Sequence, residues 1–152
     1  MPIVYLDETG FERQEGRSYA WSPAGQKVYG EISGIRRQRT SLIGGYLDRK
    51  LIAPLLFQGT CNTQVFNAWL QETLLPVLKP GTLLVLDNAS FHRSEQTQRL
   101  VKQAGCQLLF LPPYSPHLNP IEKLWANLKR FCRDYHHSTL DEAIRQSGYL
   151  LE

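Results

Sequence analysis

The sequence predicts an α/β domain with a mixed five-stranded sheet and helices on both faces. Three observations support this prediction: a strand-like segment opens the chain, a hairpin-like pair of segments follows, and helix-like and strand-like segments then alternate to the C-terminus. The chain has 152 residues, of which 42% are hydrophobic and 20% charged, as is typical of globular proteins. We therefore expect residues 1–152 to form a single domain.

The expected strands are short apolar runs that end at polar or turn-forming residues. The polar triplet 48–50 separates two of these runs by a distance that suits a hairpin. The run before Asp87 is apolar throughout, which is typical of a buried central strand. Residues 10–38 are rich in glycine, serine and charge and are expected to be irregular. The strands are predicted at 3–7, 40–47, 51–57, 83–87 and 108–111.

Helices are predicted where apolar residues recur at helical spacing. The first spans 63–78, despite a proline near its end. The second spans 94–104, and Gly105 then supplies the left-handed conformation that commonly ends a helix. A short final helix is expected to begin at Ser138 or Thr139 and to run toward the C-terminus.

The longest predicted helix opens at Asn119 and Pro120, a capping residue followed by a residue favoured in the first helical position. Its apolar stripe includes Trp125, which we expect to be a core residue rather than one that stacks on a base. Glu122 lies in the first turn, on a neighbouring face. The helix therefore combines a buried stripe with an acid at its opening.

Three acids lie at the mouths of predicted elements. Asp7 ends the first strand, Asp87 ends the buried strand, and Glu122 opens the long helix. Sheets of this class collect ligands at the carboxyl ends of their strands, so acids placed there can converge. Three converging carboxylates suit a site for two divalent metal ions that act on a phosphodiester.

Each acid also has a structural interpretation. Asp87, with the following Asn88, has the composition of a turn. Glu122 has the spacing to bond back to the N–H of Asn119 in a capping box. Asp7, next to Glu8, has the alternative of a solvated charge in a loop. The two acids also compete for the site, because neighbouring strand residues point to opposite faces and the sequence does not choose between them.

Basic residues cluster in two places although the net charge is only +3. Such patches can bind a polyanion, and alternatively they only solvate exposed faces. The candidate residues for binding a polyanion such as a nucleic acid are Arg36, Arg37 and Arg39 in one cluster, and Lys123, Lys129, Arg130 and Arg133 in the other.

The three cysteines include no Cys-x-x-Cys pair and are interpreted as reduced packing residues. A zinc site remains a weaker alternative, because its ligands would match no common spacing. Its four ligands would be His92, Cys106, His117 and Cys132. The apolar runs are strand-sized, so we expect no transmembrane span and no signal peptide, and a soluble intracellular protein.

Two long segments carry a resemblance to a known family. Residues 84–92 read Leu-Val-Leu-Asp-Asn-Ala-Ser-Phe-His, and residues 111–125 read Leu-Pro-Pro-Tyr-Ser-Pro-His-Leu-Asn-Pro-Ile-Glu-Lys-Leu-Trp. With 7–11, 19–21 and 39–59, they resemble the DDE catalytic domain of mariner-superfamily transposases, in particular the bacterial insertion-sequence branch. The implied fold is ribonuclease H-like with sheet order 3-2-1-4-5, and the predicted order of elements agrees with it.

The resemblance implies that Asp7, Asp87 and Glu122 are the catalytic residues and the ligands of two Mg²⁺ ions, with Mn²⁺ as a substitute. The implied chemistry is hydrolysis of DNA at transposon ends, followed by strand transfer into a target that contains TA. Asn88, His92 and Asn119 are supporting candidates. His92 has two open roles, one at the phosphate or a metal-bound water and the other as an anchor between loop and helix.

The implied partners are double-stranded DNA and a second copy of the chain on that DNA. The family's N-terminal helix-turn-helix region has no counterpart here, so we expect it to be absent or supplied by a separate polypeptide. A prokaryotic, nucleoid-associated location in the cytoplasm follows from the same resemblance. Two alternatives remain: a transposase remnant that only binds DNA or a partner, and another ribonuclease H-like nuclease.

Overall fold

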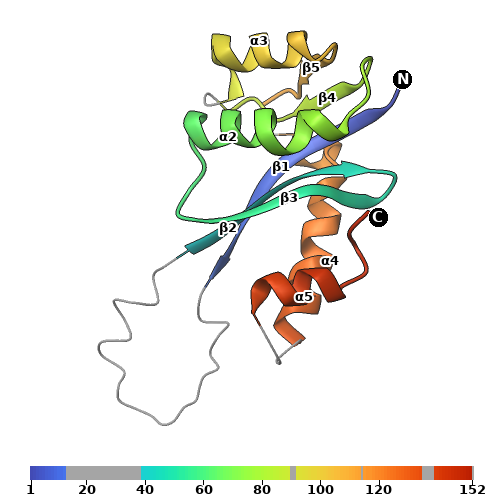
Figure 1. Cartoon of the computed structure of the whole chain (residues 1–152). Helices are drawn as coiled ribbons and strands as arrows, with labels where there is room; N and C mark the ends of the chain where they lie inside the picture. The colour runs from blue at the N-terminus through green and yellow to red at the C-terminus, as the bar shows by residue number, and fades with distance from the viewer. Residues whose placement is uncertain (13–38, 90–91, 114, 135–138, 152) are drawn as a thin grey trace.

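The computed structural model describes residues 1–12, 39–89, 92–113, 115–134 and 139–151 (Figure 1). Its centre is a five-stranded sheet in the order β3-β2-β1-β4-β5, which confirms the predicted sheet and its order. The β1–β2 and β2–β3 pairs are antiparallel, whereas β1–β4 and β4–β5 are parallel. The strands are β1 (Ile3–Glu12), β2 (Arg39–Leu47), β3 (Lys50–Gln58), β4 (Leu83–Leu86) and β5 (Gln107–Phe110).

Helices cover both faces of the sheet, as predicted: α2 and α3 lie on one side, and α4 and α5 on the other (Figure 1). Ser94 and Thr139 cap α3 and α5 through their side chains. Gly105 follows α3 with a φ of 77°, the left-handed conformation expected there. The helical segments are α2 (Thr63–Trp69), η2 (Leu70–Leu74), η3 (Leu75–Val77), α3 (Glu95–Gln103), η5 (Pro116–Leu118), α4 (Ile121–Asp134) and α5 (Leu140–Gln146).

Two apolar cores result from the alternation of side chains along the strands. The core beneath α2 and α3 includes Val4, Leu6, Ile43, Phe66, Trp69, Leu84 and Leu86. The core beneath α4 and α5 includes Phe11, Leu42, Leu51, Ile121, Trp125, Leu128 and Ile144. β1 contributes to both, so its successive residues are committed to opposite sides of the sheet.

The predicted hairpin is confirmed between β2 and β3. Leu47 pairs with Lys50, so only Asp48 and Arg49 form the loop. Their φ angles are 53° and 68°, and a two-residue type I′ turn requires positive φ at both positions.

β1 is longer than predicted, and the expectation that it ends at Asp7 is wrong. The strand continues to Glu12 because Asp7 through Glu12 pair with Gly44 through Arg39 of β2. Backbone hydrogen bonds rather than an apolar run define this extension, so the apolar pattern missed it. The expected irregular segment 10–38 therefore loses its first three residues to β1, and its remainder, 13–38, lies outside the described residues.

The predicted helix 63–78 follows a helical path but is not one regular α-helix. It begins as expected, with the Asn62 side chain accepting a hydrogen bond from the N–H of Val65 at 2.9 Å. After α2 the chain widens into the π-helical turn η2 and then tightens into the 3₁₀ turn η3. Pro76 has no N–H for the helical ladder and its ring crowds the preceding turn, which accounts for the change.

Candidate active site

The three candidate acids come from three different elements. Asp7 lies on β1 just beyond the parallel pairing with β4, which ends at Tyr5 opposite Val85. Asp87 directly follows β4, and Glu122 lies in the first turn of α4. The carboxyl groups of Asp7 and Glu122 are within hydrogen-bonding reach of each other. Asp87 and Glu122 line the same cleft.

That cleft has a volume of about 430 Å³. One part of its wall is polar and acidic, and another is the apolar Leu111-Pro112-Pro113 segment that follows β5. Such a combination suits a ligand with both a charged and an apolar part. The lining residues are Asp87, Asn88, Ala89, Leu111, Pro112, Pro113, Ser115, Asn119 and Glu122.

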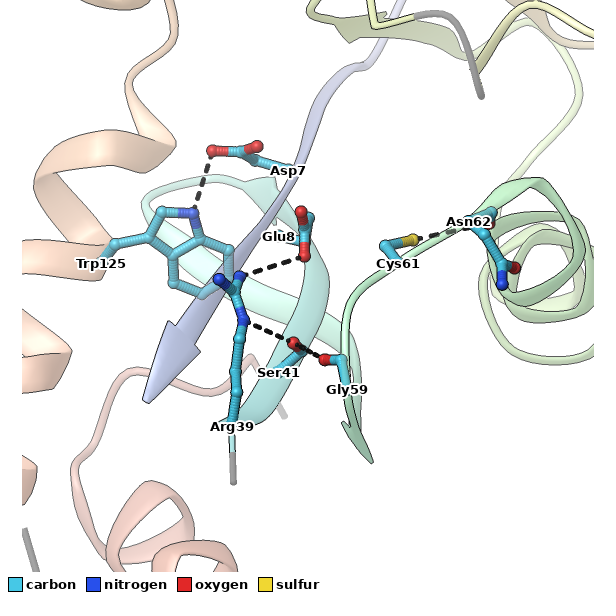
Figure 2. Close-up of polar contacts among 8 residues, drawn as sticks. All are labelled: Asp7, Glu8, Arg39, Ser41, Gly59, Cys61, Asn62 and Trp125. Atoms are coloured by element: carbon cyan, nitrogen blue, oxygen red, sulfur yellow. Dashed lines mark hydrogen bonds and ion pairs between the residues drawn. The ribbon is translucent and has the colours of Figure 1, made fainter. Parts of the chain in front are cut away.

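The Asp7 side chain is half-buried. Burial and the adjacent Glu122 carboxylate raise the pKa of Asp7 to about 8. The indole Nε1–H of Trp125 donates a hydrogen bond to Asp7 Oδ2 at 3.1 Å, and this contact opposes the rise in pKa (Figure 2). Without a cation, this pair of carboxyl groups is therefore most stable when it retains a proton.

Glu8 points away from the acidic pair, so of the two neighbouring acids only Asp7 lies near Glu122. Figure 2 shows Asp7 directed toward Trp125 and Glu8 directed toward Arg39. Glu8 Oε1 lies 3.7 Å from Arg39 Nη2, an ion pair too long for a hydrogen bond. Asp7, and not Glu8, is the acid that the fold places beside Glu122.

Arg39 is held by contacts within the protein. Its Nε donates to Ser41 Oγ at 3.0 Å, in addition to the ion pair with Glu8. The guanidinium lies over Gly10, where an added Cβ would collide with it at 2.4 Å. Glycine at this position therefore leaves the space that Arg39 occupies.

Asp87 is held by the loop that follows it. The N–H of Ala89 donates to Asp87 Oδ1 at 3.1 Å, and His92 Nδ1 lies 3.1 Å from the same oxygen and 3.3 Å from the Asp87 carbonyl. The hydrogen bond from His92 holds the pKa of Asp87 below its usual range. Among the described residues, Asp87 Oδ2 has no hydrogen-bond partner, so this oxygen remains available.

His92 has the contacts of an anchor between loop and helix, one of the two roles that the sequence left open. Its ring is buried against Phe66 of α2, with ring centroids 4.5 Å apart, and its backbone N–H donates to the Ala89 carbonyl. Asn88 lies in the lining of the cleft. The loop after β4 therefore presents Asp87 and Asn88 to the cleft while His92 attaches it to α2.

Asn119 fixes the opening of α4, as predicted. Its Nδ2 donates to the Leu6 carbonyl at 3.4 Å, and its Oδ1 accepts from the N–H of Ile121 at 3.1 Å. Among the described residues, the Glu122 carboxylate makes no capping-box bond to the N–H of Asn119. Glu122 is therefore free of the structural role considered for it and faces the cleft instead.

The basic residues of α4 lie along its exposed side. Lys123, Arg130 and Arg133 are exposed, and Lys129 is half-buried with its Nζ 5.6 Å from the centroid of the Phe11 ring. Both terminal nitrogens of Arg130 lie 3.1 Å from Asn127 Oδ1. Arg36 and Arg37 lie outside the described residues.

The weaker zinc alternative has no geometric support in the described part of the chain. No three His, Cys, Asp or Glu side chains there are arranged to hold one metal ion. Burial raises the pKa of the Cys132 thiol to about 11, so this thiol stays protonated at neutral pH. Cys106 is buried in the core beneath α2 and α3.

The same finding holds for the three candidate acids, which do not surround one ion-sized position in the described part of the chain. Asp7, Asp87 and Glu122 nonetheless fit a hard divalent cation by their chemistry. Carboxylate oxygens are the ligands that Mg²⁺ and Mn²⁺ prefer, and two of the three carboxyl groups, those of Asp7 and Glu122, are within hydrogen-bonding reach of each other. The raised pKa of Asp7, about 8, means that the pair binds a proton in the absence of another cation. A bound metal ion would neutralise the same negative charge.

Comparison with known proteins agrees with this geometry. A family model described as DDE superfamily endonuclease matches residues 2–144. The chain belongs to this family. The expected DDE domain is therefore confirmed. The sheet order and the solved structures described below confirm the ribonuclease H-like fold expected with it. None of the helices in the described ranges has the length and apolar character needed to cross a membrane.

Individual relatives of this DDE domain point the same way. A 39 kDa uncharacterized protein of insertion element IS630 from Shigella sonnei is 23% identical over 164 residues, with 99% of this chain and 45% of that protein covered. A chain of the Mos1 strand transfer complex is 20% identical with a TM-score of 0.66, covering 95% of this chain and 44% of that chain. The Mos1 transposase catalytic domain solved with raltegravir and Mg is 17% identical with a TM-score of 0.61, covering 94% and 67%. The chain spans about half the length of the curated relatives that it matches.

Sequence reasoning missed the contribution of Trp125 to the site of this DDE domain. Its apolar spacing on α4 correctly predicted burial, but its indole N–H also reaches Asp7. The available signal was its position three residues after Glu122, which places both side chains on the same side of a helix.

Proposed function

We propose that this DDE domain cleaves DNA phosphodiester bonds and transfers the resulting 3′ end, using divalent metal ions held by Asp7, Asp87 and Glu122. The observation that carries the proposal is the proximity of the half-buried Asp7 carboxyl to Glu122, within hydrogen-bonding reach, at the edge of a cleft that also contains Asp87. Two neighbouring carboxylates repel each other, which lowers the stability of the fold unless a cation or a proton lies between them. A site built this way is typical of metal-dependent catalysis.

A different set of contacts holds each of the three acids in position. Asp7 is fixed by β1 and Trp125, Asp87 by Ala89 and His92, and Glu122 by the Asn119 turn that opens α4. When bound, two divalent ions at these carboxylates would activate the attacking oxygen and stabilise the leaving oxygen of an in-line displacement. The Mos1 catalytic domain has been solved with Mg and with Mn, which supports the choice of metal.

The charges of the site also favour a nucleic acid as substrate. Three carboxylates carry a charge of −3 and two divalent ions +4, so a DNA phosphate would complete the balance. The second ion should therefore bind weakly without DNA. The exposed basic residues of α4 continue away from Glu122 and would contact neighbouring phosphates, which gives affinity without sequence choice.

The proposed function also implies DNA and protein partners for the chain. We infer that the substrates are double-stranded transposon ends and a TA-containing target, bound by two copies of the chain. Mos1 complexes with this fold include a strand transfer complex and a paired-end complex with the left transposon end, which supports an assembly on paired ends. A helix-turn-helix polypeptide would supply recognition of the end sequence.

The deciding experiment measures nicking of supercoiled and end-containing DNA in Mg²⁺ or Mn²⁺. The parent chain is compared with Asp87→Ala and Glu122→Gln, and with Asp141→Asn as a control because Asp141 is an exposed acid of α5 that pairs with Arg145. We expect cleavage by the parent and the control and a loss of at least about 10³-fold in the two site variants, as for groups that act directly on the reacting centre. No cleavage by the parent in either metal would favour the binding-remnant alternative, and undiminished cleavage by Asp87→Ala would refute the site assignment.

A further inference from the structure

We propose that Trp125 is a positioning residue of the acidic site, whose indole N–H fixes the Asp7 carboxylate beside Glu122. The inference rests on the proposed function, in which these two acids hold a divalent metal ion. Trp125 would touch neither the metal nor the DNA. It would act only through Asp7.

The contact is well formed and partly buried. Nε1 of Trp125 lies 3.1 Å from Asp7 Oδ2, and the Trp125 side chain is only 3% exposed. A hydrogen bond from a neutral donor to a carboxylate is stronger than one between neutral groups, and more so away from solvent. The indole therefore restrains the rotation of the Asp7 side chain as well as filling space in the core beneath α4.

One helix supplies both the donor and a partner acid. Trp125 follows Glu122 by three residues on α4, so the two side chains project from the same side of the helix. Asp7 receives the indole N–H while its carboxyl group remains within hydrogen-bonding reach of Glu122. Helix α4 therefore carries both Glu122 and the group that holds Asp7, so this one helix limits how far the two acids can separate.

A second contact attaches α4 to the adjacent residue of β1. Asn119 Nδ2 donates to the carbonyl of Leu6, immediately before Asp7. Together, the two bonds join the first turns of α4 to consecutive residues of one strand. Like-charged carboxylates would otherwise tend to separate, so a preorganised metal site needs such attachments.

The chain contains a matched control in Trp69. This residue is also buried, at 1% exposure, and its Nε1 also donates a hydrogen bond, at 2.7 Å to the Ala53 carbonyl. It lies in the core on the opposite face of the sheet and contacts no candidate acid. Loss of the Trp69 indole therefore measures the general cost of removing a buried, hydrogen-bonded tryptophan.

The first measurement is the affinity of the full chain for Mn²⁺ without DNA, determined by electron paramagnetic resonance. The variants are Trp125→Phe, Trp69→Phe and a chain with 3-benzothienylalanine at position 125, which preserves the indole shape and removes only the N–H. We expect Mn²⁺ to bind roughly 10–100-fold more weakly to both chains altered at position 125, the usual effect of losing an outer-shell partner. Trp69→Phe should bind Mn²⁺ like the parent even if it unfolds at a lower temperature.

The second measurement is the indole N–H signal in a ¹H–¹⁵N spectrum, with the Trp125 signal assigned as the one missing from Trp125→Phe. Addition of Mg²⁺ should move the Trp125 signal and leave the Trp69 signal in place. In Asp7→Ala, the Trp125 signal should no longer respond to Mg²⁺. A purely structural role for Trp125 predicts no such response.

The outcomes separate this inference from the proposed function. Parental Mn²⁺ affinity in the benzothienylalanine chain would overturn the inference and leave the nuclease proposal standing. A parent that binds Mn²⁺ but does not cleave DNA would overturn the nuclease proposal, while the affinities would still decide the role of Trp125. A parent that binds no Mn²⁺ would overturn both.

Discussion

His92 Nδ1 lies 3.1 Å from Asp87 Oδ1, and the His92 side chain is only 4% exposed. The imidazole thus connects the acid at the end of β4 to α2, against which it packs through Phe66. Asp87 itself is more than half exposed, at 57% of its side chain. An exposed acid is therefore held in place by a buried base, and the consequences of removing that base can be measured.

Replacement of His92 by leucine should impair the site more than the fold. Leucine retains apolar volume against Phe66 but donates no hydrogen bond to Asp87, so metal-dependent cleavage should fall roughly 10–100-fold. His92→Asn, which offers a side-chain N–H near the position of Nδ1, should recover part of the loss. The measurement is the nicking rate as a function of Mn²⁺ concentration, with thermal unfolding in parallel.

Thr97→Val is a suitable control for His92. Its buried hydroxyl bonds to Asn67 and Ser94 between α2 and α3 and contacts no candidate acid. This variant should lose about 1–3 kcal/mol of stability, the usual effect of leaving buried partners unsatisfied. Its Mn²⁺ dependence should match that of the parent. Equal effects of Thr97→Val and His92→Leu on cleavage would contradict a specific role for His92.

The metal-free chain should lose stability as the pH rises from about 4 to about 8. Folded Asp7 retains its proton to about pH 8, whereas in the unfolded chain it releases the proton near the ordinary aspartate pKa of 3.8. Between these values the folded state binds more protons, so its free energy of unfolding decreases with pH, by at most about 1.4 kcal/mol per unit. The stabilising contribution is complete below the unfolded pKa, declines between the two pKa values, and is fully lost above the folded pKa.

Urea unfolding in EDTA between pH 4.5 and 8.5 tests this dependence. Asp7→Asn, which cannot titrate, should show a weaker decline than the parent. Saturating Mg²⁺ should add stability that increases with pH, because the metal competes with the proton on Asp7. Identical pH profiles for the parent and Asp7→Asn would exclude a raised pKa at Asp7.

Asn119→Ala should lose both stability and activity, because it removes the cap of α4 and its attachment to Leu6. The cap alone contributes about 1 kcal/mol. Asn119→Ser should keep an acceptor for the helix N–H but lose the long reach to the Leu6 carbonyl, so it should recover stability better than it recovers cleavage. Chemical unfolding and nicking assays distinguish the two effects.

The cap of α5 provides the comparison for Asn119. Thr139 Oγ1 accepts the N–H of Glu142 at 3.2 Å, and this cap is exposed. Thr139→Ala should cost a similar stability of about 1 kcal/mol without changing the cleavage rate of the folded protein. If Thr139→Ala impaired cleavage as strongly as Asn119→Ala, global stability would explain both.

Basic residues on α4 should determine the salt dependence of DNA binding. Lys129→Gln and Arg133→Gln should each reduce the slope of log affinity against log salt by about 0.9 if the residue contacts one phosphate. Arg145→Gln on α5 is the control, because Arg145 already pairs with Asp141 and Glu142. Arg39→Gln should change the slope less than the α4 variants, because Arg39 is held by Glu8 and Ser41. Slopes from fluorescence anisotropy across a salt series decide the question, and an unchanged slope would remove the residue from the DNA surface.

Most of the sheet was predictable because local signals coincide with it. The apolar run of β4 indicates a buried strand, and the polar triplet between β2 and β3 fixes a hairpin. The extension of β1 to Glu12 was not predictable from apolar residues, since its ladder with β2 is made by backbone groups. The π-helical turn before Pro76 likewise depends on how the chain accommodates one missing N–H.

The candidate site was predictable as residue types and less so as contacts. The resemblance identified Asp7, but only the faces of β1 show why Glu8 is directed away from Glu122. The partner of the Trp125 N–H lies 118 residues away along the chain, so helical periodicity could predict burial but not the hydrogen bond. Arg39 was predicted to be a cation available to DNA because of its charge. In the fold it instead forms an ion pair with Glu8.

The choice of Asp7 over Glu8 depends on the pairing register of β1 rather than on either side chain. Asp7 opposes Gly44 and Glu8 opposes Ile43 in a ladder that runs without interruption from Tyr5 to Glu12. A slip of one residue would exchange the two faces of the strand and bring the longer Glu8 to the position beside Glu122. The pairing register of the antiparallel β1–β2 ladder thus decides which carboxylate lies beside Glu122 and would be offered to the proposed metal.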